Sequence, residues 1–371
     1  MRFKHLFLAT ACLATLTFGS DMAQADNHFT TAADFKRQGL DIKNFQPVSF
    51  SPDSSSILGI AYNGKDGIAQ GKKYSLAVLS FDQKLAVTKV KKYDIDIPMI
   101  EQVTYTPDGK SVIFTSRSGA TFQKLDLATG KISTIMEHKT GTPGFRCYPL
   151  LMVQYKDQFL VNGFFYDKDD YAERNSVAIL DTNKTGVEAF TKVAEVQKAQ
   201  SKVHRDSKYY FDCLVSPKYA FFVDNLGTTV DYNVWNLQDS KLDFKTFDKG
   251  LNTVGMWSFE DKLLYSIQRS KSNYDLILYN AETNKKVDIA TGTQVPYRDL
   301  YLSQDGKTAM FSIMNEGSTR ARTCYARESE NWQVKPIQGY NELAYGMQRI
   351  SPNGKYMLVS TDKGMRIFDV K

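Results

Sequence analysis

The chain has 371 residues, a formal net charge of +6, and 42% hydrophobic and 13% aromatic residues. This composition predicts a folded protein with a large core, because disordered chains have fewer aromatic residues and a larger net charge. The Lys and Arg residues form no dense block, so we expect no nucleic-acid partner.

The first 25 residues have the pattern of a secretory signal peptide. A cationic start (MRFKH) precedes an apolar run (LFLATACLATLTFG), and the small residues of MAQA end at Ala25 as an A-x-A cleavage site. The apolar run is short for a membrane span, although an uncleaved signal anchor is the alternative. We expect a signal peptide over residues 1–25 and a single periplasmic or secreted domain over 26–371. This domain should be monomeric and should not span a membrane.

A strand–turn–strand pattern occurs seven times in the predicted domain, 43 to 60 residues apart. In its turns, Pro fixes φ, Asp or Asn binds its own backbone, and Gly permits a left-handed conformation. We therefore expect the Asp residues of these turns to be structural. The seven segments are FSPDSSSILGIAY (from Phe50), YTPDGKSVIFTS (Tyr105), YKDQFLVNGFFY (Tyr155), VSPKYAFFVDN (Val215), SFEDKLLYSIQ (Ser258), LSQDGKTAMFSI (Leu302) and ISPNGKYMLVS (Ile350).

A second strand–turn–strand pattern follows the first in six of the seven units. Each unit therefore reads as four antiparallel strands, and such units stacked radially form a β-propeller. The predicted fold is all-β: a seven-bladed β-propeller. The second patterns are LSFDQKLAV (79–87), LDLATGKI (125–132), LDTNKTGV (180–187), WNLQDSKL (235–242), YNAETNKKV (279–287) and YARESENWQV (325–334).

The seventh unit ends after MRIFDV, one strand short of a complete blade. A missing outer strand leaves an unpaired sheet edge unless another segment covers it. We expect residues 29–37, within HFTTAADFKRQ, to pair with the strand near Arg366–Val370 and to close the ring. The alternative is a three-stranded last blade with a frayed N-terminus.

The SPDG-type turns, each followed by an apolar strand and a hairpin of the LDLATGK type, resemble the TolB-like, WD40-like β-propeller repeats of bacterial envelope proteins. The resemblance covers residues 45–371, but YKDQ, SPKY and FEDK depart from the turn motif. The stretch before Phe45 is also too short for the N-terminal α/β domain of TolB. The resemblance implies a propeller fold and a cell-envelope setting, without a particular partner.

Enzyme and metal signatures are sparse in the predicted domain. His28, His138 and His204 lack metal-ligand spacing, and there is no nucleophile elbow, P-loop or dinucleotide fingerprint. We expect no cofactor and no metal centre. Asp167, with Asp169 and Asp170 in YDKDDYAERN, could attract calcium, but a solvated loop is the simpler interpretation.

The topology places the longer and more variable loops on one face of the disc, the face that joins the second and third strands of each blade. Binding residues concentrate on loops held by a rigid scaffold, so we expect a binding site at the channel mouth on this face. The candidate binding residues on the inner strands are Gln46, Glu101, Arg146, Asp212, Arg298, Asp299, Gln348 and Arg349.

Two functional classes fit this arrangement. The first is a non-catalytic module that binds a protein partner or a small-molecule ligand on the loop face. The second is an enzyme that acts on a carbohydrate or lactone, for which Glu101, Asp212 and Asp299 are the candidate carboxylates. The missing catalytic motifs favour binding.

Loss of Cys12 with the signal peptide leaves Cys147, Cys213 and Cys324, an odd number. Cys147 and Cys213 are offset by six residues relative to their turns, which corresponds to roughly 20 Å along a strand. A disulfide needs Cα atoms within about 7 Å. We expect three reduced cysteines.

Overall fold

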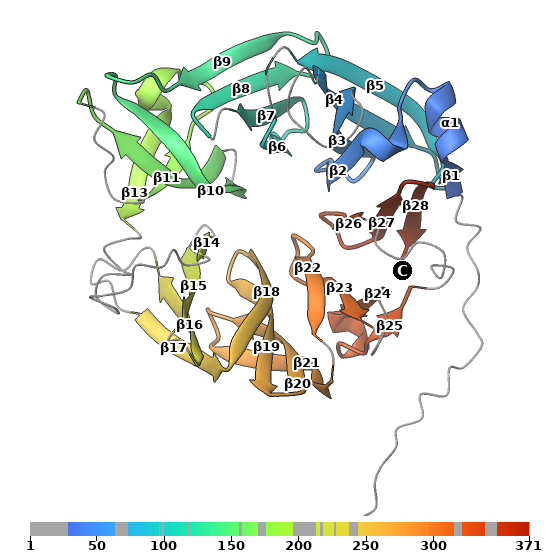
Figure 1. The fold of residues 1–371 in the computed structure, drawn as a ribbon, viewed down its shortest axis with the longest axis vertical. Coiled ribbons are helices and arrows are strands. Elements are labelled where there is room, and N and C mark those ends of the chain that lie inside the picture. The colour runs from blue at the N-terminus through green and yellow to red at the C-terminus, as the bar shows by residue number, and fades with distance from the viewer. Residues whose placement is uncertain are drawn as a thin grey trace, which may run out of the picture.

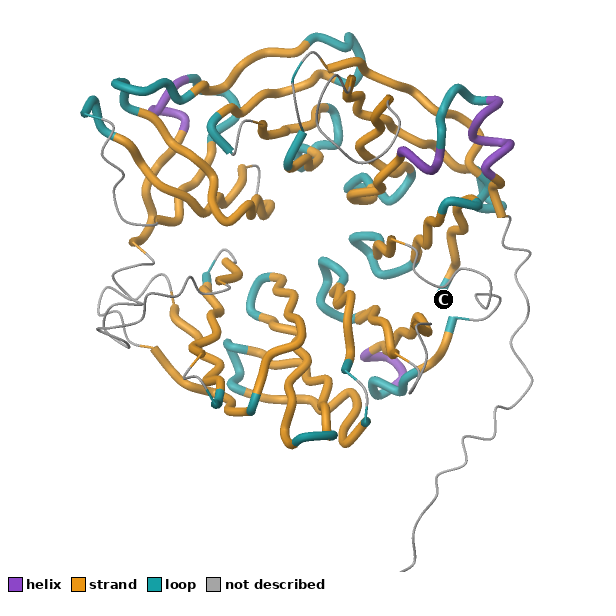
Figure 2. Tube along the Cα trace, viewed as in Figure 1, coloured by secondary structure: helices purple, strands orange, loops and turns teal. Residues whose placement is uncertain are grey.

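Seven four-stranded antiparallel sheets form a ring in the computed structural model, with the first strand of each sheet nearest the centre (Figures 1 and 2). Each sheet is one blade, and the prediction of a seven-bladed β-propeller is confirmed. The structure describes residues 29–63, 73–95, 97, 100–116, 119–155, 158–169, 176–195, 213–215, 218–225, 228–236, 244–294, 296–314, 321–337 and 347–370. The predicted signal peptide lies outside these residues.

Six blades are continuous in sequence, and their strands follow one another from the channel outward. Blade 1 contains β2 (Phe45–Phe50), β3 (Ser56–Asn63), β4 (Lys73–Phe81) and β5 (Val87–Ile95), and blade 2 contains β6 (Gln102–Tyr105), β7 (Ser111–Ser116), β8 (Thr121–Asp126) and β9 (Ile132–Glu137). Blade 3 contains β10 (Gly144–Tyr155), β11 (Gln158–Tyr166), β12 (Ser176–Leu180) and β13 (Phe190–Glu195), and blade 4 contains β14 (Cys213–Val215), β15 (Tyr219–Asn225), β16 (Val230–Asn236) and β17 (Phe244–Gly250).

Blades 5 and 6 follow the same pattern. Blade 5 contains β18 (Asn252–Phe259), β19 (Lys262–Ser270), β20 (Asn273–Asn280) and β21 (Lys285–Thr293). Blade 6 contains β22 (Tyr297–Leu302), β23 (Thr308–Met314), β24 (Ala321–Arg327) and β25 (Lys335–Pro336). Three short 3₁₀ helices connect or precede strands: η1 (Ile42–Asn44), η2 (Gly186–Ala189) and η3 (Glu328–Glu330).

The last blade joins the two ends of the described chain. Blade 7 contains β26 (Met347–Ile350), β27 (Tyr356–Thr361) and β28 (Gly364–Asp369), and β1 (Phe29–Thr31) is its outer strand. Phe29 lies opposite Arg366, and Thr31 lies opposite Gly364. Closure of the ring by an N-terminal strand is therefore confirmed, and the alternative of a three-stranded last blade is excluded.

The closing strand is shorter than the predicted segment 29–37, because a helix, α1 (Ala32–Arg37), follows it directly. The Thr31 side chain accepts a hydrogen bond from the Asp34 amide at 3.2 Å, and the Thr31 amide donates to the Asp34 carboxylate at 2.9 Å. This capping box satisfies the first free amides of the helix and begins it at Ala32. Residues 32–37 are therefore helical rather than extended.

The N-terminal segment also fills the join between blades 7 and 1. Phe35, Leu40 and Ile42 are buried in one apolar cluster with Leu358 and Ile367 of blade 7 and with residues of blade 1. Comparable clusters lie between neighbouring blades elsewhere, for example Ile60 and Leu76 against Val112 and Phe114. The core of the protein is thus mainly a set of contacts between blades.

The turns between first and second strands share one geometry in blades 1, 2, 6 and 7. A Ser or Thr hydroxyl donates to the Asp or Asn two residues later, and that side chain accepts the backbone amide two residues further on. The residue after the Asp or Asn has a left-handed conformation, and blade 1 places Ser54 there instead of Gly. The structural role predicted for these Asp residues is confirmed. The left-handed residues are Ser54, Gly109, Gly306 and Gly354.

The connections between second and third strands lie at the opposite end of each blade, on the loop face as predicted. One of them is short: within RSKSNYD (269–275), β19 extends to Ser270 and β20 begins at Asn273, which leaves a two-residue connection. The strands simply continue through the polar residues.

A buried charged cluster joins blades 4 and 5. Both carboxylate oxygens of Asp248 on β17 accept hydrogen bonds from Arg269 on β19, each at 2.8 Å, and Asp248 also accepts one from the hydroxyl of Tyr265. Arg269 donates in addition to Asp275 at 2.9 Å. Burial raises the pKa of Asp248, but the hydrogen bonds from Arg269, Tyr265 and the Lys249 amide outweigh burial and lower the pKa to about 2. The cluster therefore holds a charged carboxylate inside the protein.

The three cysteines of the predicted domain lie on blades 3, 4 and 6. Cys147 is on β10 and Cys213 is on β14, and the side chains of both lie outside what the structure describes. Cys324 on β24 is a free, buried thiol. Burial raises the pKa of Cys324 to about 12. The expectation of three reduced thiols therefore stays a prediction for two of them.

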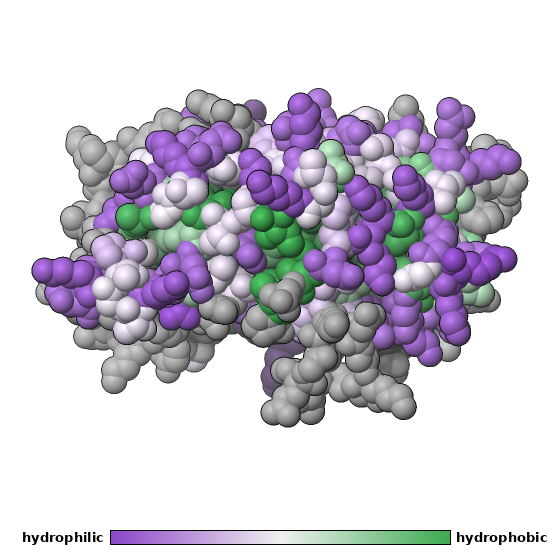
Figure 3. All heavy atoms as spheres, turned by 90° about the horizontal axis from the view of Figure 1, so that it is seen from above, coloured by the Kyte–Doolittle hydropathy of each residue, from purple (hydrophilic) through white to green (hydrophobic). Residues whose placement is uncertain are grey.

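The side of the rim seen in Figure 3 is mostly polar where the structure describes it. Seen from the rim, hydrophilic side chains predominate, and apolar side chains form separate patches (Figure 3). Within the described part of the chain, no helix has the length and hydrophobicity needed to cross a membrane.

Candidate functional site

A cavity of about 420 Å³ lies along the central channel. Its described wall comes from the inner strands of blades 1, 2, 5, 6 and 7, namely β2, β6, β18, β22 and β26, and from the turns that follow them. Gln46 and Glu101 lie at the starts of inner strands, near the loop face, whereas Gln304 and Pro352 lie in turns at the opposite face. The cavity therefore extends along the channel and is not confined to the loop-face mouth.

One register position of the inner strand lines the cavity in all five of these blades. The residue at this position pairs with a fully buried apolar residue on the second strand. In four of these blades the next residue along the strand also lines the cavity: Phe50, Ser258, Leu302 and Ile350. The five pairs are Ser49 with Leu58, Thr104 with Ile113, Trp257 with Leu264, Tyr301 with Met310, and Arg349 with Leu358.

The two aromatic residues at this position, Trp257 and Tyr301, form what we call the aromatic shelf. Their ring centroids are 5.0 Å apart, with an angle of 58° between the ring planes. Trp257 is 40% exposed, although it lies on an inner strand of a large protein. Burial raises the pKa of Tyr301, so its phenol keeps its proton at neutral pH. Trp257 thus lines the cavity with part of its indole exposed.

Arg349 fixes the shelf in place. Its Nη1 donates to the Tyr301 hydroxyl at 2.8 Å and to the Gln348 carbonyl at 2.6 Å, and its Nε donates to the Val48 carbonyl. The guanidinium carbon lies 5.4 Å from the centroid of the Tyr301 ring. Arg349 thus ties blades 6, 7 and 1 together at the channel. A guanidinium has five N–H groups, and the two on Nη2 have no acceptor among the described residues.

The rest of the polar wall is mainly uncharged. It contains the amides of Gln46, Gln102 and Gln304 and several Ser and Thr hydroxyls. Two of its buried polar atoms, Ser49 Oγ and Gln102 Oε1, have no hydrogen-bond partner among the residues that the structure describes. Glu101 is the one acidic residue of the described wall, and its carboxylate accepts a hydrogen bond from the Gly119 amide at 2.7 Å.

Bulges shape the inner strands next to the cavity. The pairing register shifts between Pro47 and Ser49 in blade 1, between Thr253 and Gly255 in blade 5, and between Arg298 and Tyr301 in blade 6. A bulge inserts an extra residue and changes the direction of its neighbours. In blade 6, Asp299 takes a left-handed conformation with φ of 49°. The bulges set where the shelf and its partners point.

The structure brings three of the eight predicted residues to the cavity: Gln46, Glu101 and Arg349. Arg298 and Asp299 are exposed and lie outside its described wall. Gln348 is 4% exposed and points between blades, where it donates to the hydroxyls of Ser312 and Thr323 at 2.7 Å each.

Arg146 is half-buried, with its guanidinium carbon 6.0 Å from the Tyr166 ring centroid, and Asp212 lies outside the described residues. The acidic segment 166–175 is described only to Asp169, whose amide donates to Asp167 at 2.9 Å. Among the described residues, no group of three or more His, Cys, Asp or Glu side chains could hold a metal ion.

Sequence reasoning missed Trp257 and Tyr301. Their position in the sequence, counted back from the turn between the first and second strands, could have identified them. When the inner strands are aligned on their turns, Trp257 and Tyr301 occupy the same position as Arg349, which was selected.

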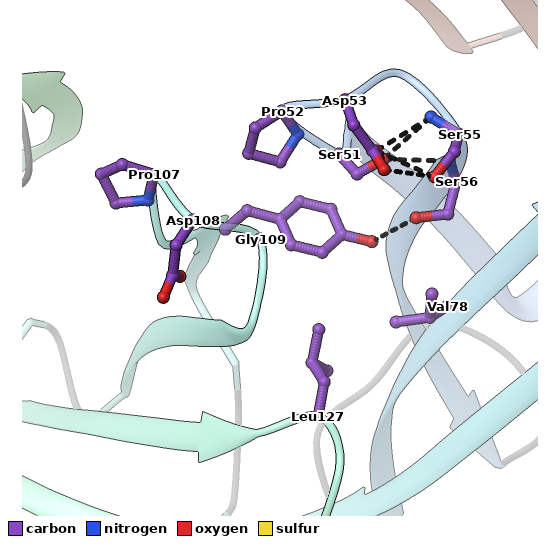
Figure 4. Close-up of a pocket in the computed structure, with 11 residues that line it drawn as sticks. Ser51, Pro52, Asp53, Ser55, Ser56, Val78, Pro107, Asp108, Gly109 and Leu127 are labelled. Atoms are coloured by element: carbon purple, nitrogen blue, oxygen red, sulfur yellow. Dashed lines mark hydrogen bonds between the residues drawn. The ribbon is translucent and has the colours of Figure 1, made fainter.

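A second cavity, of about 440 Å³, lies between the first turns of blades 1 and 2 (Figure 4). Two turn carboxylates, Asp53 and Asp108, are among its lining residues. Hydrogen bonds from Thr106 and the Lys110 amide lower the pKa of Asp108. Asp53 accepts hydrogen bonds from Ser51 at 2.6 Å and from Ser55 at 2.8 Å. Both carboxylates are therefore used by their own turns, and the channel cavity is the stronger candidate site.

No protein-family model matches the sequence, and no curated protein matches it either. Among solved structures, an oligogalacturonate lyase in complex with manganese is similar, with 12% sequence identity, a TM-score of 0.56 and coverage of 86% of this chain and 86% of that chain. The β-propeller domain of Cps50 (Swd1) from Myceliophteria thermophila has 11% identity and a TM-score of 0.50, with coverage of 89% and 97%. TolB from Acinetobacter baumannii has 14% identity and a TM-score of 0.42, with coverage of 82% and 67%. The chain thus has the β-propeller fold that the resemblance of its turns to WD40-like repeats implied.

Proposed function

We propose that the protein is a non-catalytic binding module of the cell envelope, which holds a ligand in the central channel of its propeller. The observation that carries this proposal is the aromatic shelf. An indole that is 40% exposed inside a cavity of about 420 Å³ offers a large apolar surface beside polar groups in fixed positions. Concave sites of this kind, apolar with a few oriented polar groups, are typical of ligand binding.

The shelf is rigid enough to act as a binding surface. Trp257 stands on β18, and its partner Tyr301 is held by the hydrogen bond and ring contact from Arg349. Groups held on strands by packing and by further hydrogen bonds lose little conformational entropy when a ligand binds. Trp, Tyr and Arg are also the residue types that most often dominate the binding energy of an interface.

The alternative is an enzyme that acts on a carbohydrate or lactone. The similarity to an oligogalacturonate lyase supports it only at the level of fold. Glycoside hydrolysis uses two carboxyl groups, whereas the described wall supplies Glu101. This alternative therefore depends on a second acid, such as Asp212, from outside the described residues.

Export to the envelope is part of the proposal and rests on the signal-peptide pattern of residues 1–25. Edman degradation of the protein purified from its native cells tests it. A mature N-terminus near Asp26 is expected. A protein that retains residues 1–25 would contradict cleavage and would favour the signal anchor.

Native mass spectrometry tests ligand binding. The protein is incubated with an extract of its native envelope and desalted, and we expect a compound of defined mass to stay bound to the wild type. Trp257→Ala should reduce the bound fraction at least tenfold. Leu251→Ala is the matched control, because Leu251 is also exposed, at 42%, but lies outside the cavity. Equal retention by Trp257→Ala and wild type would contradict the site.

The same experiment separates binding from catalysis. The bound compound is released by denaturation after one hour and after one day and its mass is compared. An unchanged mass supports a binding module. A compound converted by the wild type, but not in buffer alone, would support the enzyme alternative.

A further inference from the structure

We infer that the ligand of the channel is an uncharged saccharide of one or two rings. This inference rests on the proposed function, because it names the ligand class of the same cavity. Four features of the described wall support it: the exposed indole of Trp257, the neutral polar side chains, the balance of charge and the size of the cavity.

The first feature is the exposed indole of Trp257. A pyranose ring has C–H groups along one face and hydroxyl groups around its edge. Such a ring can cover the exposed side of Trp257 with its C–H face and turn its hydroxyls toward the polar wall. The indole packs against Tyr301 at a centroid distance of 5.0 Å. Its orientation is therefore fixed before a sugar ring binds. An aromatic surface of this kind excludes water from both partners.

The second feature is the neutral polar wall, which contains the amides of Gln46, Gln102 and Gln304 and several Ser and Thr hydroxyls. Amide and hydroxyl side chains both donate and accept hydrogen bonds. A sugar hydroxyl also donates and accepts, so it can pair with either kind of group. A carboxylate or phosphate group carries acceptors alone and would use only the donors of this wall. The wall therefore matches hydroxyls better than anions.

The third feature is the balance of charge. The described wall contains one guanidinium, from Arg349, and one carboxylate, from Glu101, and its other polar groups are neutral amides and hydroxyls. An anionic ligand would gain from the Nη2 of Arg349 but would be repelled by Glu101. Neutral hydroxyls can use both groups, because they accept from Arg349 and donate to Glu101.

The fourth feature is size. A volume of about 420 Å³ is near the lower end of the range of about 300–1,000 Å³ that small-molecule sites occupy. This space suits one or two sugar rings.

Tryptophan fluorescence tests the inference directly. The chain has three tryptophans, and Trp235 and Trp332 are only 2% and 8% exposed. Quenching by acrylamide should therefore report mainly on Trp257. The mature protein is titrated with glucose, galactose, mannose, N-acetylglucosamine, maltose and cellobiose, and separately with glucuronate, galacturonate and a mixture of tripeptides. We expect at least one neutral sugar to lower the quenching constant at least twofold.

Two substitutions locate the sugar. Trp257→Phe should abolish the protection from acrylamide quenching that the sugar gives to the wild type. Gln102→Leu should weaken affinity for the same sugar at least tenfold, as measured by calorimetry. Gln123→Leu is the matched control, because Gln123 also has a buried side-chain oxygen without a partner but lies on β8, outside the cavity wall. Affinity should not change in this control, and thermal melting checks that all variants are folded.

Three results would overturn the inference. If only glucuronate and galacturonate, or only peptides, protect Trp257, the ligand class is wrong while the channel still binds, so the proposed function stands. If no neutral sugar protects Trp257 while native mass spectrometry finds a bound compound, the ligand class is again wrong and the proposed function again stands. If neither experiment finds a ligand, the inference and the proposed function both fail.

Discussion

Replacing Asp248 with Asn should destabilise the protein in a way that depends on pH. The carboxylate is buried between blades 4 and 5, and it accepts two hydrogen bonds from Arg269 and one from Tyr265. Asparagine keeps the size of the side chain but removes its charge and one of its acceptors. Arg269 then keeps Asp275, at 2.9 Å, as its remaining carboxylate partner.

The magnitude follows from the pKa of Asp248, which is about 2 in the folded protein against an ordinary value of 3.8. Such a difference contributes about 2 kcal/mol to the free energy of unfolding. Because the folded pKa is the lower one, this stability is fully present above pH 3.8 and is lost as pH falls through 2. The Asn variant should therefore be less stable by about 2–4 kcal/mol at pH 7, the larger figure including hydrogen bonds that Arg269 and Tyr265 lose.

Urea unfolding at pH 7, 5, 4 and 3 measures the difference between wild type and Asp248→Asn. We expect the difference to be constant from pH 7 to 5 and its charge-dependent part to fall to about half at pH 3. Asp231→Asn is the control, because Asp231 bonds to Lys249 at 2.9 Å at the surface, and it should cost less than about 1 kcal/mol. A loss below about 1 kcal/mol at pH 7 for Asp248→Asn, or a difference as large at pH 3 as at pH 7, would refute the reasoning.

Three further predictions concern closure, turns and thiols. Deletion of residues 29–37 should cost more than about 3 kcal/mol, because β28 loses its partner and the buried Phe35 is removed, and an unchanged melting temperature would contradict closure. Asp108→Ala should cost about 1–2 kcal/mol, because Thr106 and Lys110 lose their acceptor, yet ligand retention in the channel should not change; lost retention at full stability would move the site to the turn face. Cys324, whose pKa burial raises to about 12, should not react with Ellman's reagent at pH 8 until the protein is denatured. Three thiols should then appear in the mature protein, and a count of one would reveal a disulfide.

The sequence predicted the propeller because its turns have chemistry that repeats. Ser, Pro, Asp and Gly each satisfy a local requirement of the turn, so the motif can be found without knowledge of distant contacts. The boundary of the closing strand was harder to predict. Thr31 favours a strand by propensity, but it also caps a helix when Asp34 follows, and burial of Phe35 in a contact between blades supports the helix.

The candidate site was predicted only in part, for a reason that lies in strand geometry. Gln348 and Arg349 were both assigned to the channel, yet consecutive residues of a regular strand point to opposite sides. Arg349 faces the channel and Gln348 faces Ser312. In blade 6 a bulge breaks this alternation and leaves Arg298 and Asp299 both exposed. Bulges depend on pairing with the next strand, so the sequence of one strand does not reveal them.

Closure by β1 has a consequence for how the chain reaches its native state. Phe29 and Arg366 are paired although they are 366 − 29 = 337 residues apart in sequence. Bringing segments this distant together costs about 5 kcal/mol of chain entropy, and β28 follows the other described strands of the ring in sequence. The first strand must therefore wait for its partner until the other six blades have been synthesised, and until then Phe35, Leu40 and Ile42 lack their contacts with Leu358 and Ile367. A chain that is cut or stalled before Gly364 keeps this apolar segment and the edge of β27 open to proteases and to aggregation. Protection of this segment therefore depends on synthesis of β28 and its pairing with β1.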